Sequence, residues 1–219
     1  MTISVVIPCR NEAEGIAKVI QSVPKGVSEI IGVDNNSTDD TGKIAAVAGA
    51  KVVFEPRPGH GSAVRAGFKH ATGDIIAALD GDGQYPARAI TEIAQFLEVN
   101  GFDFVSASRF PLSNPKVMSR IRMLGNIFLT KAANTLFWLN STDILTSMLV
   151  FRRSVLDTIR LESDGMPFSS EIKIRAHRRR FRIGEYHIPY ATRLGESKLV
   201  PWKHGFVILM YFLRLRFGR

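Results

Sequence analysis

The chain has 219 residues, of which 45% are apolar and 22% charged, a globular composition that excludes an intrinsically disordered protein. Its single cysteine, Cys9, excludes a disulfide framework, and no cluster of Cys and His has the spacing of zinc ligands. Residues 1–100 carry nine basic and twelve acidic residues, whereas residues 101–219 carry twenty basic and eight acidic residues. We therefore expect a cation site in the first half and an anionic partner for the second half.

The first half alternates short apolar runs with helical patterns. Buried strands are expected at 3–8, Glu29–Asp34, 51–55, 74–79 and 102–107, and helices at 11–20 (opened by Asn11 or Glu12), 37–48, 63–71 and 87–99. This alternation predicts an α/β fold, a mostly parallel sheet flanked by helices. The first residues read as a strand and not as a signal peptide, which with the lone thiol favours a cytoplasmic setting.

The second half is less regular. One long or broken helix is expected at 118–139, a strand at 148–151, a helix at 169–178, a strand at 181–190 and an amphipathic helix at 202–217. No linker or internal repeat divides the chain, so a single domain over residues 1–219 is the simplest interpretation.

Two carboxylates follow the strand expected at 74–79, in Asp80-Gly81-Asp82-Gly83-Gln84. Ligands bind beyond the carboxyl ends of strands in open α/β sheets, and alternate carboxylates plus an amide oxygen suit Mg²⁺ or Mn²⁺. An EF-hand is excluded because Thr91 stands where its last glutamate is needed. The alternative is a glycine-rich turn with solvated carboxylates.

Polar residues also follow the first two strands. Arg10 and Glu12 come after the first, and Asp34 ends the second, where it is placed to accept a hydrogen bond from a ribose or a base. The nearby Ser37-Thr38-Asp39 segment is interpreted as helix capping.

Motifs in both halves together resemble glycosyltransferase family two, with its GT-A fold, and within it the dolichyl- or polyprenyl-phosphate sugar synthases. The motifs are Val5-Val6-Ile7-Pro8-x-x-Asn11-Glu12, Val33-Asp34-x-x-Ser37-Thr38-Asp39, Gly59-x-Gly61-x-Ala63-x-x-x-Gly67, Ala71-x-Gly73-Asp74, Asp80-x-Asp82-x-Gln84, Ala107-Ser108-Arg109 and Arg193-x-Gly195-Glu196-Ser197-Lys198.

The resemblance implies a role for each matching position. Residues around the nucleoside would be Pro8, Arg10, Glu12 and Asp34. The metal and donor diphosphate would lie on Asp80, Gly81, Asp82 and Gln84, with Arg193 and Lys198 closing over the phosphates. The acceptor phosphate would meet Arg109, Arg122 and Asn126, of which the last two share a helix face by their spacing. Residues 1–107 would thus bind the nucleotide sugar, 108–200 the acceptor, and 201–219 the membrane interface.

Several positions depart from the family pattern. Asn35 stands where a second aspartate is usual, His60 where lysine is usual, and Gly81 where alanine is usual. Thr146-Ser147-Met148 follows Asp143 in place of Ser-Gly-Phe. The reaction class is unaffected, but the donor stays open between GDP-mannose and a UDP-hexose.

The expected reaction is inverting transfer of one sugar from a nucleoside diphosphate to a polyprenyl phosphate. A phosphomonoester has a second pKa of about 6, so this acceptor needs no protein base. Polysaccharide synthases of the family carry a Gln-x-x-Arg-Trp motif, which this sequence lacks. The alternative is transfer to a hydroxyl of a glycan or glycolipid, with Asp143 as the base.

The last helix is expected to lie on a membrane. Its apolar run, residues 206–213, is far shorter than the ~20 residues needed to span, and basic residues flank it. We therefore expect peripheral attachment to the inner face of the cytoplasmic membrane, a core helix being the alternative. A nucleic-acid-binding module, suggested by the basic run 177–182, leaves Asp80 and Asp82 unexplained. A membrane-protein partner or a second copy of the chain is left open.

Overall fold

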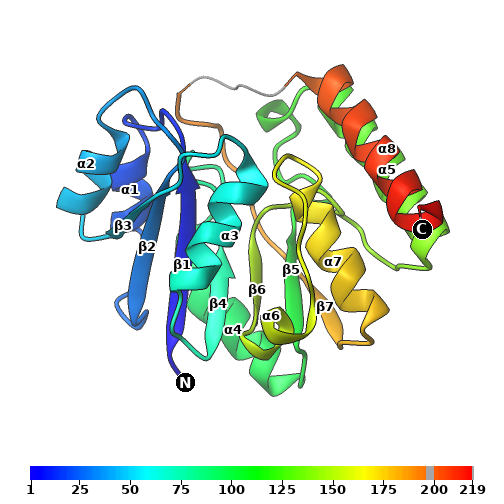
Figure 1. Cartoon of the computed structure of the whole chain (residues 1–219), viewed down its shortest axis with the longest axis horizontal. Helices are drawn as coiled ribbons and strands as arrows, with labels where there is room; N and C mark the ends of the chain where they lie inside the picture. Colours follow the sequence, from blue (N-terminus) through cyan, green and yellow to red (C-terminus); the bar gives the residue numbers. More distant parts are fainter. Residues whose placement is uncertain (196–199, 219) are drawn as a thin grey trace.

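The computed structural model describes residues 1–195 and 200–218, which form one sheet covered by helices on both faces (Figure 1). The strand order is β3-β2-β1-β4-β6-β5-β7. β6 runs antiparallel to its neighbours β4 and β5, and the other pairs are parallel. The strands are β1 (Ile3–Cys9), β2 (Glu29–Asp34), β3 (Lys51–Phe54), β4 (Ile75–Ala78), β5 (Phe104–Ser108), β6 (Leu149–Arg152) and β7 (Ile183–His187).

Each face of the sheet has its own apolar core. One core is closed by α1 (Ile16–Gln21), α2 (Thr41–Val47) and α4 (Ile90–Val99), the last preceded by the short η1 (Ala87–Ala89). The other is closed by α3 (His60–His70), α6 (Ser154–Thr158) and α7 (Phe168–Arg178). The central strands are buried on both sides, as their continuous apolar runs predicted, and the mostly parallel α/β fold is confirmed.

Two long helices form a separate layer beside α7 (Figure 1). α5 (Arg120–Phe137), which follows η2 (Pro115–Val117), is one unbroken helix and packs along α8 (Pro201–Phe217). Phe137 and Phe212 meet edge to face, with ring centroids 6.1 Å apart. Among the described residues, no helix has the length and apolarity required to cross a bilayer.

Two helices begin later than the sequence predicted. α1 starts at Ile16 and not at Asn11 or Glu12, because Asn11 adopts a left-handed conformation (φ 51°) that a helix excludes. α2 starts at Thr41 and not at Ser37. The hydroxyl of Ser37 accepts a hydrogen bond from the Asn11 backbone N–H at 3.0 Å, so it joins two loops and caps no helix.

Two further differences concern the helices on the other face. α3 begins at His60, earlier than expected, directly after Gly59 in a conformation (φ 135°) that only glycine adopts readily. The five-residue helix α6 was not predicted, because so short a segment has too few turns to show helical periodicity.

Candidate active site

The ends of three parallel strands bring the acidic residues of the first half to one edge of the sheet. Cys9 of β1 lies opposite Asp34 of β2, and Val6 lies opposite Ala78 of β4. The loops that leave these strands therefore start side by side. They carry Arg10 and Glu12, then Asp34, then Asp80 and Asp82.

Asp34 is held at the edge of this site by its neighbours. One carboxylate oxygen accepts from the Ser37 backbone N–H at 3.0 Å, and the other lies 2.8 Å from where a Cβ at Gly42 would stand. Gly42 therefore leaves the space that this carboxylate needs. Among the other residues predicted around the nucleoside, Pro8 is buried in β1 and Arg10 is exposed.

Asn35, one of the departures from the family pattern, serves the loops and not a ligand. Its buried amide nitrogen donates to the carbonyls of Glu55 and Arg57 at 3.0 and 2.7 Å. Its amide oxygen accepts from the Gly59 backbone N–H at 2.9 Å. A carboxylate has no N–H to give these carbonyls, so asparagine is required by the local packing.

The turn after β4 presents two carboxylates in different surroundings. The Asp80 side chain is 28% exposed, and its Oδ1 lies 3.7 Å from Nδ1 of His60. Asp82 is buried, and its Oδ1 accepts from the Gln84 backbone N–H at 3.0 Å. Burial, followed by the charge of Asp80, raises the pKa of Asp82 to about 7. The turn therefore concentrates negative charge that a cation would relieve.

Both glycines of the turn are needed for close packing. A Cβ at Gly81 would lie 3.1 Å from Ile16 and 3.3 Å from Cys9. Gly83 has a φ of 76°, and a Cβ there would lie 2.8 Å from Leu194. The turn is thus pressed between α1 and the segment before residue 196.

That segment, residues 190–195, is here called the strap because it crosses the turn. The Leu194 and Ala191 backbone N–H groups donate to the carbonyls of Asp82 and Gln84, each at 2.9 Å. The side-chain amide nitrogen of Gln84 in turn donates a hydrogen bond to the Ala191 carbonyl at 3.1 Å. Gln84, predicted as a metal ligand, thus fixes the strap to the turn.

Arg193 of the strap joins two of the predicted site residues. Its guanidinium forms ion pairs with Asp82 and with Glu12, which come from different strand ends. The structure therefore brings Glu12, Asp82 and Arg193 together, three residues to which the sequence analysis gave separate roles. Lys198, also predicted here, lies outside the described residues.

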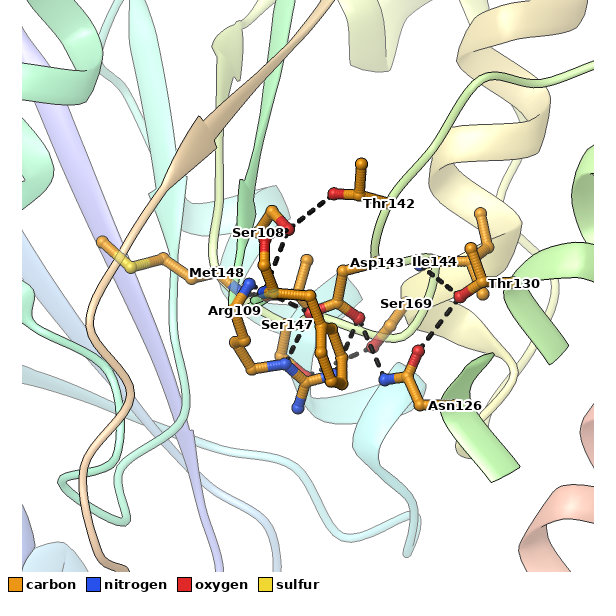
Figure 2. Close-up of polar contacts among 12 residues, drawn as sticks. Ser108, Arg109, Asn126, Thr130, Thr142, Asp143, Ile144, Ser147, Met148 and Ser169 are labelled. Atoms are coloured by element: carbon orange, nitrogen blue, oxygen red, sulfur yellow. Dashed lines mark hydrogen bonds and ion pairs between the residues drawn. The ribbon is translucent and has the colours of Figure 1, made fainter. Parts of the chain in front are cut away.

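Two residues predicted to meet the acceptor phosphate, Arg109 and Asn126, belong to a polar network around Asp143 (Figure 2). Asp143 is fully buried, and its two carboxylate oxygens accept hydrogen bonds from Nε and Nη2 of Arg109 at 2.6 and 2.8 Å. The Arg109 backbone N–H adds a third bond at 3.2 Å. Such a two-pronged pair fixes the plane of the guanidinium, and Nη1 lies outside the pair.

Asn126 of α5 belongs to the same network. Its amide nitrogen donates to Asp143 at 3.0 Å, and its oxygen accepts from the Thr130 hydroxyl at 3.0 Å (Figure 2). Asn126 thus contacts Asp143 directly, and its predicted contact with an acceptor phosphate stays a prediction. Arg122 lies one turn earlier on α5 and is partly exposed.

Lys173 of α7 holds the loop that carries Asp143. Its ammonium donates to the carbonyls of Asp143, Ile144 and Thr146 at 3.1, 2.8 and 3.0 Å. Burial lowers the pKa of Lys173 to about 7. The three carbonyls oppose this, because only the ammonium has three N–H groups to give them, so we assign the charged form.

Asp143 is poorly suited to act as a base. Burial alone would raise its pKa, but Arg109, Lys173 and Asn126 outweigh burial and lower the pKa to about 2. Both carboxylate oxygens already accept hydrogen bonds. A group that binds a proton so weakly, and is so enclosed, has little capacity to take one from an acceptor hydroxyl.

Two tyrosines connect the donor turn with this network. The Tyr85 hydroxyl, directly after the turn, accepts from the Ser147 backbone N–H at 3.0 Å. The Tyr85 and Tyr190 rings meet edge to face at 5.2 Å, and the Arg109 guanidinium lies 5.1 Å from the Tyr190 ring centroid. The two sides of the site are thus in direct contact.

Sequence reasoning missed Lys173, Tyr85 and Tyr190. The only local signal for Lys173 is its place between the two apolar residues Ile172 and Ile174. The tyrosines carry no motif of their own.

A family model and the similar proteins of known sequence all point to glycosyltransferases. Residues 4–160 match the family model described as "Glycosyl transferase family 2". A Mycobacterium tuberculosis protein described as an uncharacterised glycosyltransferase is 35% identical over 207 residues, 94% of this chain and 93% of that protein. The dolichyl-phosphate hexose transferase of Haloferax volcanii is 31% identical over 210 residues, 94% and 90% of the two chains.

Solved structures share the fold at lower identity. Glucosyl-3-phosphoglycerate synthase of Mycobacterium tuberculosis, in complex with phosphoglyceric acid, superposes with a TM-score of 0.80 at 22% identity, over 98% of this chain and 80% of that one. Its complex with Mn²⁺, UDP-glucose and phosphoglyceric acid has a TM-score of 0.79 at 23% identity, over 98% and 79%.

Proposed function

The chain belongs to glycosyl transferase family 2, and from this premise we propose that it transfers one sugar from a nucleoside diphosphate to a polyprenyl phosphate, with inversion. It is a glycosyltransferase with the GT-A fold. The observation that carries the choice of acceptor is the buried Arg109–Asp143 pair. Nη1 of Arg109 lies outside this pair, whereas both carboxylate oxygens of Asp143 already accept hydrogen bonds. This suits an acceptor that is already an anion. The likeness to a dolichyl-phosphate hexose transferase supports the same acceptor class.

The donor diphosphate belongs at the turn after β4. Asp80 and Asp82 are the carboxylates that would hold Mg²⁺ or Mn²⁺, with the remaining positions left to phosphate oxygens and water. The fit rests on two carboxylates on alternate residues of a turn at a strand end, where burial and the charge of Asp80 raise the pKa of Asp82. Among the described residues, no group of three or more His, Cys, Asp or Glu side chains is arranged to hold a metal ion. When bound, the ion would neutralise the charge of the departing diphosphate.

We propose that the Arg193 side chain occupies two positions, one without the donor and one with the donor bound. In the structure its guanidinium pairs with Asp82 and Glu12 and so balances the charge that the ion would balance. With donor present, the same guanidinium would turn to the diphosphate, where an arginine fork fits well. The donor nucleoside would lie against Asp34, Arg10 and Pro8; GDP-mannose and a UDP-hexose both remain candidates.

On the acceptor side, Arg109 and Arg122 would orient the lipid phosphate. A phosphate oxygen forms the new bond to the anomeric carbon while the bond from that carbon to the diphosphate oxygen breaks. No proton has to be removed, because the phosphate is largely ionised at neutral pH. Attack from the side opposite the diphosphate inverts the anomeric centre.

A polyprenyl phosphate is found in a membrane, and α8 has a surface that could lie on that membrane. Its exposed apolar side chains include Trp202, Phe206, Met210 and Phe217, and the helix contains no acidic residue. α5 is also free of acidic residues, and it exposes Ile121, Leu124, Ile127 and Phe128. We propose that α8, supported by α5, lies on the inner face of the cytoplasmic membrane.

The test is incubation of the full chain with Mn²⁺ or Mg²⁺, a panel of radiolabelled nucleotide sugars, and undecaprenyl or dolichyl phosphate. A labelled lipid from at least one donor is expected, and its formation should stop with a metal chelator. The free lipid alcohols are the matched control, because they differ only in the phosphate. Equal labelling of alcohol and phosphate would reject the acceptor assignment, and no labelling of any lipid would reject the function.

A further inference from the structure

A cavity of about 640 Å³ lies away from the active site, where the C-terminal ends of α5, α7 and α8 meet. Its lining includes His177, Arg178, Arg180 and Arg216, and none of its lining residues, all within the described chain, is acidic. It is here called the arginine cavity. Nothing in the proposed sugar transfer uses it.

The arginines are held in place by aromatic rings. The Arg178 guanidinium lies 5.1 Å from the Phe137 ring centroid, and Arg216 lies 4.6 Å from that of Trp138. Stacking of this kind occupies the face of a guanidinium and leaves its N–H edge for an anion. The side chains are therefore ordered before a ligand arrives.

The positive charge in the cavity is only partly balanced. Three helices end here, and each C-terminus supplies about half a negative charge. Arg178 also donates to the Leu215 carbonyl at 2.9 Å, which satisfies one of its N–H groups. Burial and then the charges of Arg216 and Arg175 lower the pKa of Arg178, the direction expected where cations crowd together. A bound anion would relieve this crowding.

The position of the cavity indicates where that anion comes from. Trp138 and Phe217, beside the arginines, have 72% and 69% of their surface exposed. Exposed aromatic side chains next to arginines are typical of the level of lipid headgroups. The same end of α8 carries Leu213, which is also exposed.

We propose that the arginine cavity binds the phosphate of an anionic phospholipid headgroup and so fixes the C-terminal end of α8 on the bilayer. Arg178 and Arg216 contact the phosphate through their free edges, and Arg180 adds charge at the rim. The inference shares membrane contact with the proposed function but requires no sugar transfer, so either can fail alone.

The experiment is co-sedimentation of the full chain with vesicles of phosphatidylcholine, with and without phosphatidylglycerol. Arg178→Gln/Arg216→Gln should weaken binding to the anionic vesicles about thirtyfold, since each basic residue near such a surface contributes about a factor of five. The control Lys25→Gln/Arg88→Gln removes the same charge from exposed positions of the first half and should change binding less than about twofold.

Two further variants separate a site from diffuse charge. Arg178→Lys/Arg216→Lys keeps the charge but loses the stacked forks, so it should also bind weakly; wild-type binding would overturn the proposal. Arg180→Gln leaves the packing of α8 intact and should weaken binding about fivefold even if the double variants fold poorly in thermal melts.

Soluble glycerol 3-phosphate distinguishes the two sources of phosphate. If it raises the melting temperature of the wild type but not of Arg178→Gln/Arg216→Gln, while all variants bind vesicles equally, the ligand is a free phosphate ester and the lipid assignment is wrong. Equal vesicle binding without any such shift would also overturn the proposal. Loss of vesicle binding in the arginine variants alone supports it.

Discussion

The carboxylate of Asp143 holds the guanidinium of Arg109 by two parallel hydrogen bonds of 2.6 and 2.8 Å, although 34 residues separate them in the chain. The Arg109 guanidinium of this pair also lies over the ring of Tyr190 from the strap. Under the proposed function we expect Asp143 to be a positioning residue, which acts on the acceptor through Arg109.

Asp143→Asn tests that assignment. An amide cannot accept both N–H groups of the fork, so the KM for polyprenyl phosphate should rise about tenfold, the worth of one charged hydrogen bond. The shape of the pH profile of kcat should not change. The matched control is Asp157→Asn on exposed α6. Loss of one limb of the profile with an unchanged KM would instead identify Asp143 as a base.

The same carboxylate predicts how stability depends on pH. The pKa of Asp143 is about 2 in the folded chain against a usual 3.8, so its contribution is complete above the usual value and is lost as pH falls toward 2. The shift corresponds to about 2 kcal/mol of unfolding free energy. Urea midpoints measured from neutral to acidic pH should fall more steeply for the wild type than for Asp143→Asn. Parallel curves would contradict the assignment.

Asp82→Asn should abolish tight binding of Mn²⁺ in the presence of the nucleoside diphosphate. Titration calorimetry measures the ion directly, and kcat should fall by about a hundredfold or more. Asp74→Asn, an exposed aspartate at the opposite end of β4, is the control. Full Mn²⁺ affinity in Asp82→Asn would remove this residue from the metal site.

Arg193→Gln should separate metal binding from turnover. The guanidinium pairs with Asp82 and Glu12, so a metal must displace it. Without it, Mn²⁺ alone should bind at least about threefold more tightly, while kcat falls because the donor phosphates lose an arginine. Arg160→Gln, exposed and remote in sequence, serves as control. Weaker Mn²⁺ binding in Arg193→Gln would show that the two cations do not compete.

Lys173→Met keeps the length of the side chain and removes its charge. Three buried carbonyls then lose their donors, which should lower the free energy of unfolding by about 3 kcal/mol. Lys69→Met, on the exposed side of α3, should change it by less than about 0.5 kcal/mol. Denaturant unfolding compares the two variants. Equal stability would mean that the loop is held by other contacts.

The sequence predicted the strands well because their apolar runs are continuous, as in β1 and β4, and are buried on both faces. It predicted helix starts less well. The loop at Asn11 and the loop at Ser37 bond to each other, and side chains that meet across 26 residues cannot be recognised as partners from local pattern.

The site shows the same division. The candidate residues at strand ends lie together, because a parallel sheet brings strand ends together whatever the loops do, and Arg193 meets Glu12 and Asp82. The role of Asn126 at the acceptor phosphate was assigned from the family and stays a prediction, but its hydrogen bond to Asp143 was not foreseen. Helix spacing places Asn126 beside Arg122 but contains no information about which buried partner it finds.

The placing of β6 has a consequence for protein engineering. This strand, residues Leu149–Arg152, comes from the part of the chain that we propose binds the acceptor, but it lies between β4 and β5 of the part that we propose binds the donor. Exchange of residues 1–107 between relatives would therefore create new strand pairs on both sides of β6. Donor specificity should transfer only in chimeras in which residues 1–107 are grafted together with the residues of β6 and of the strap that contact them.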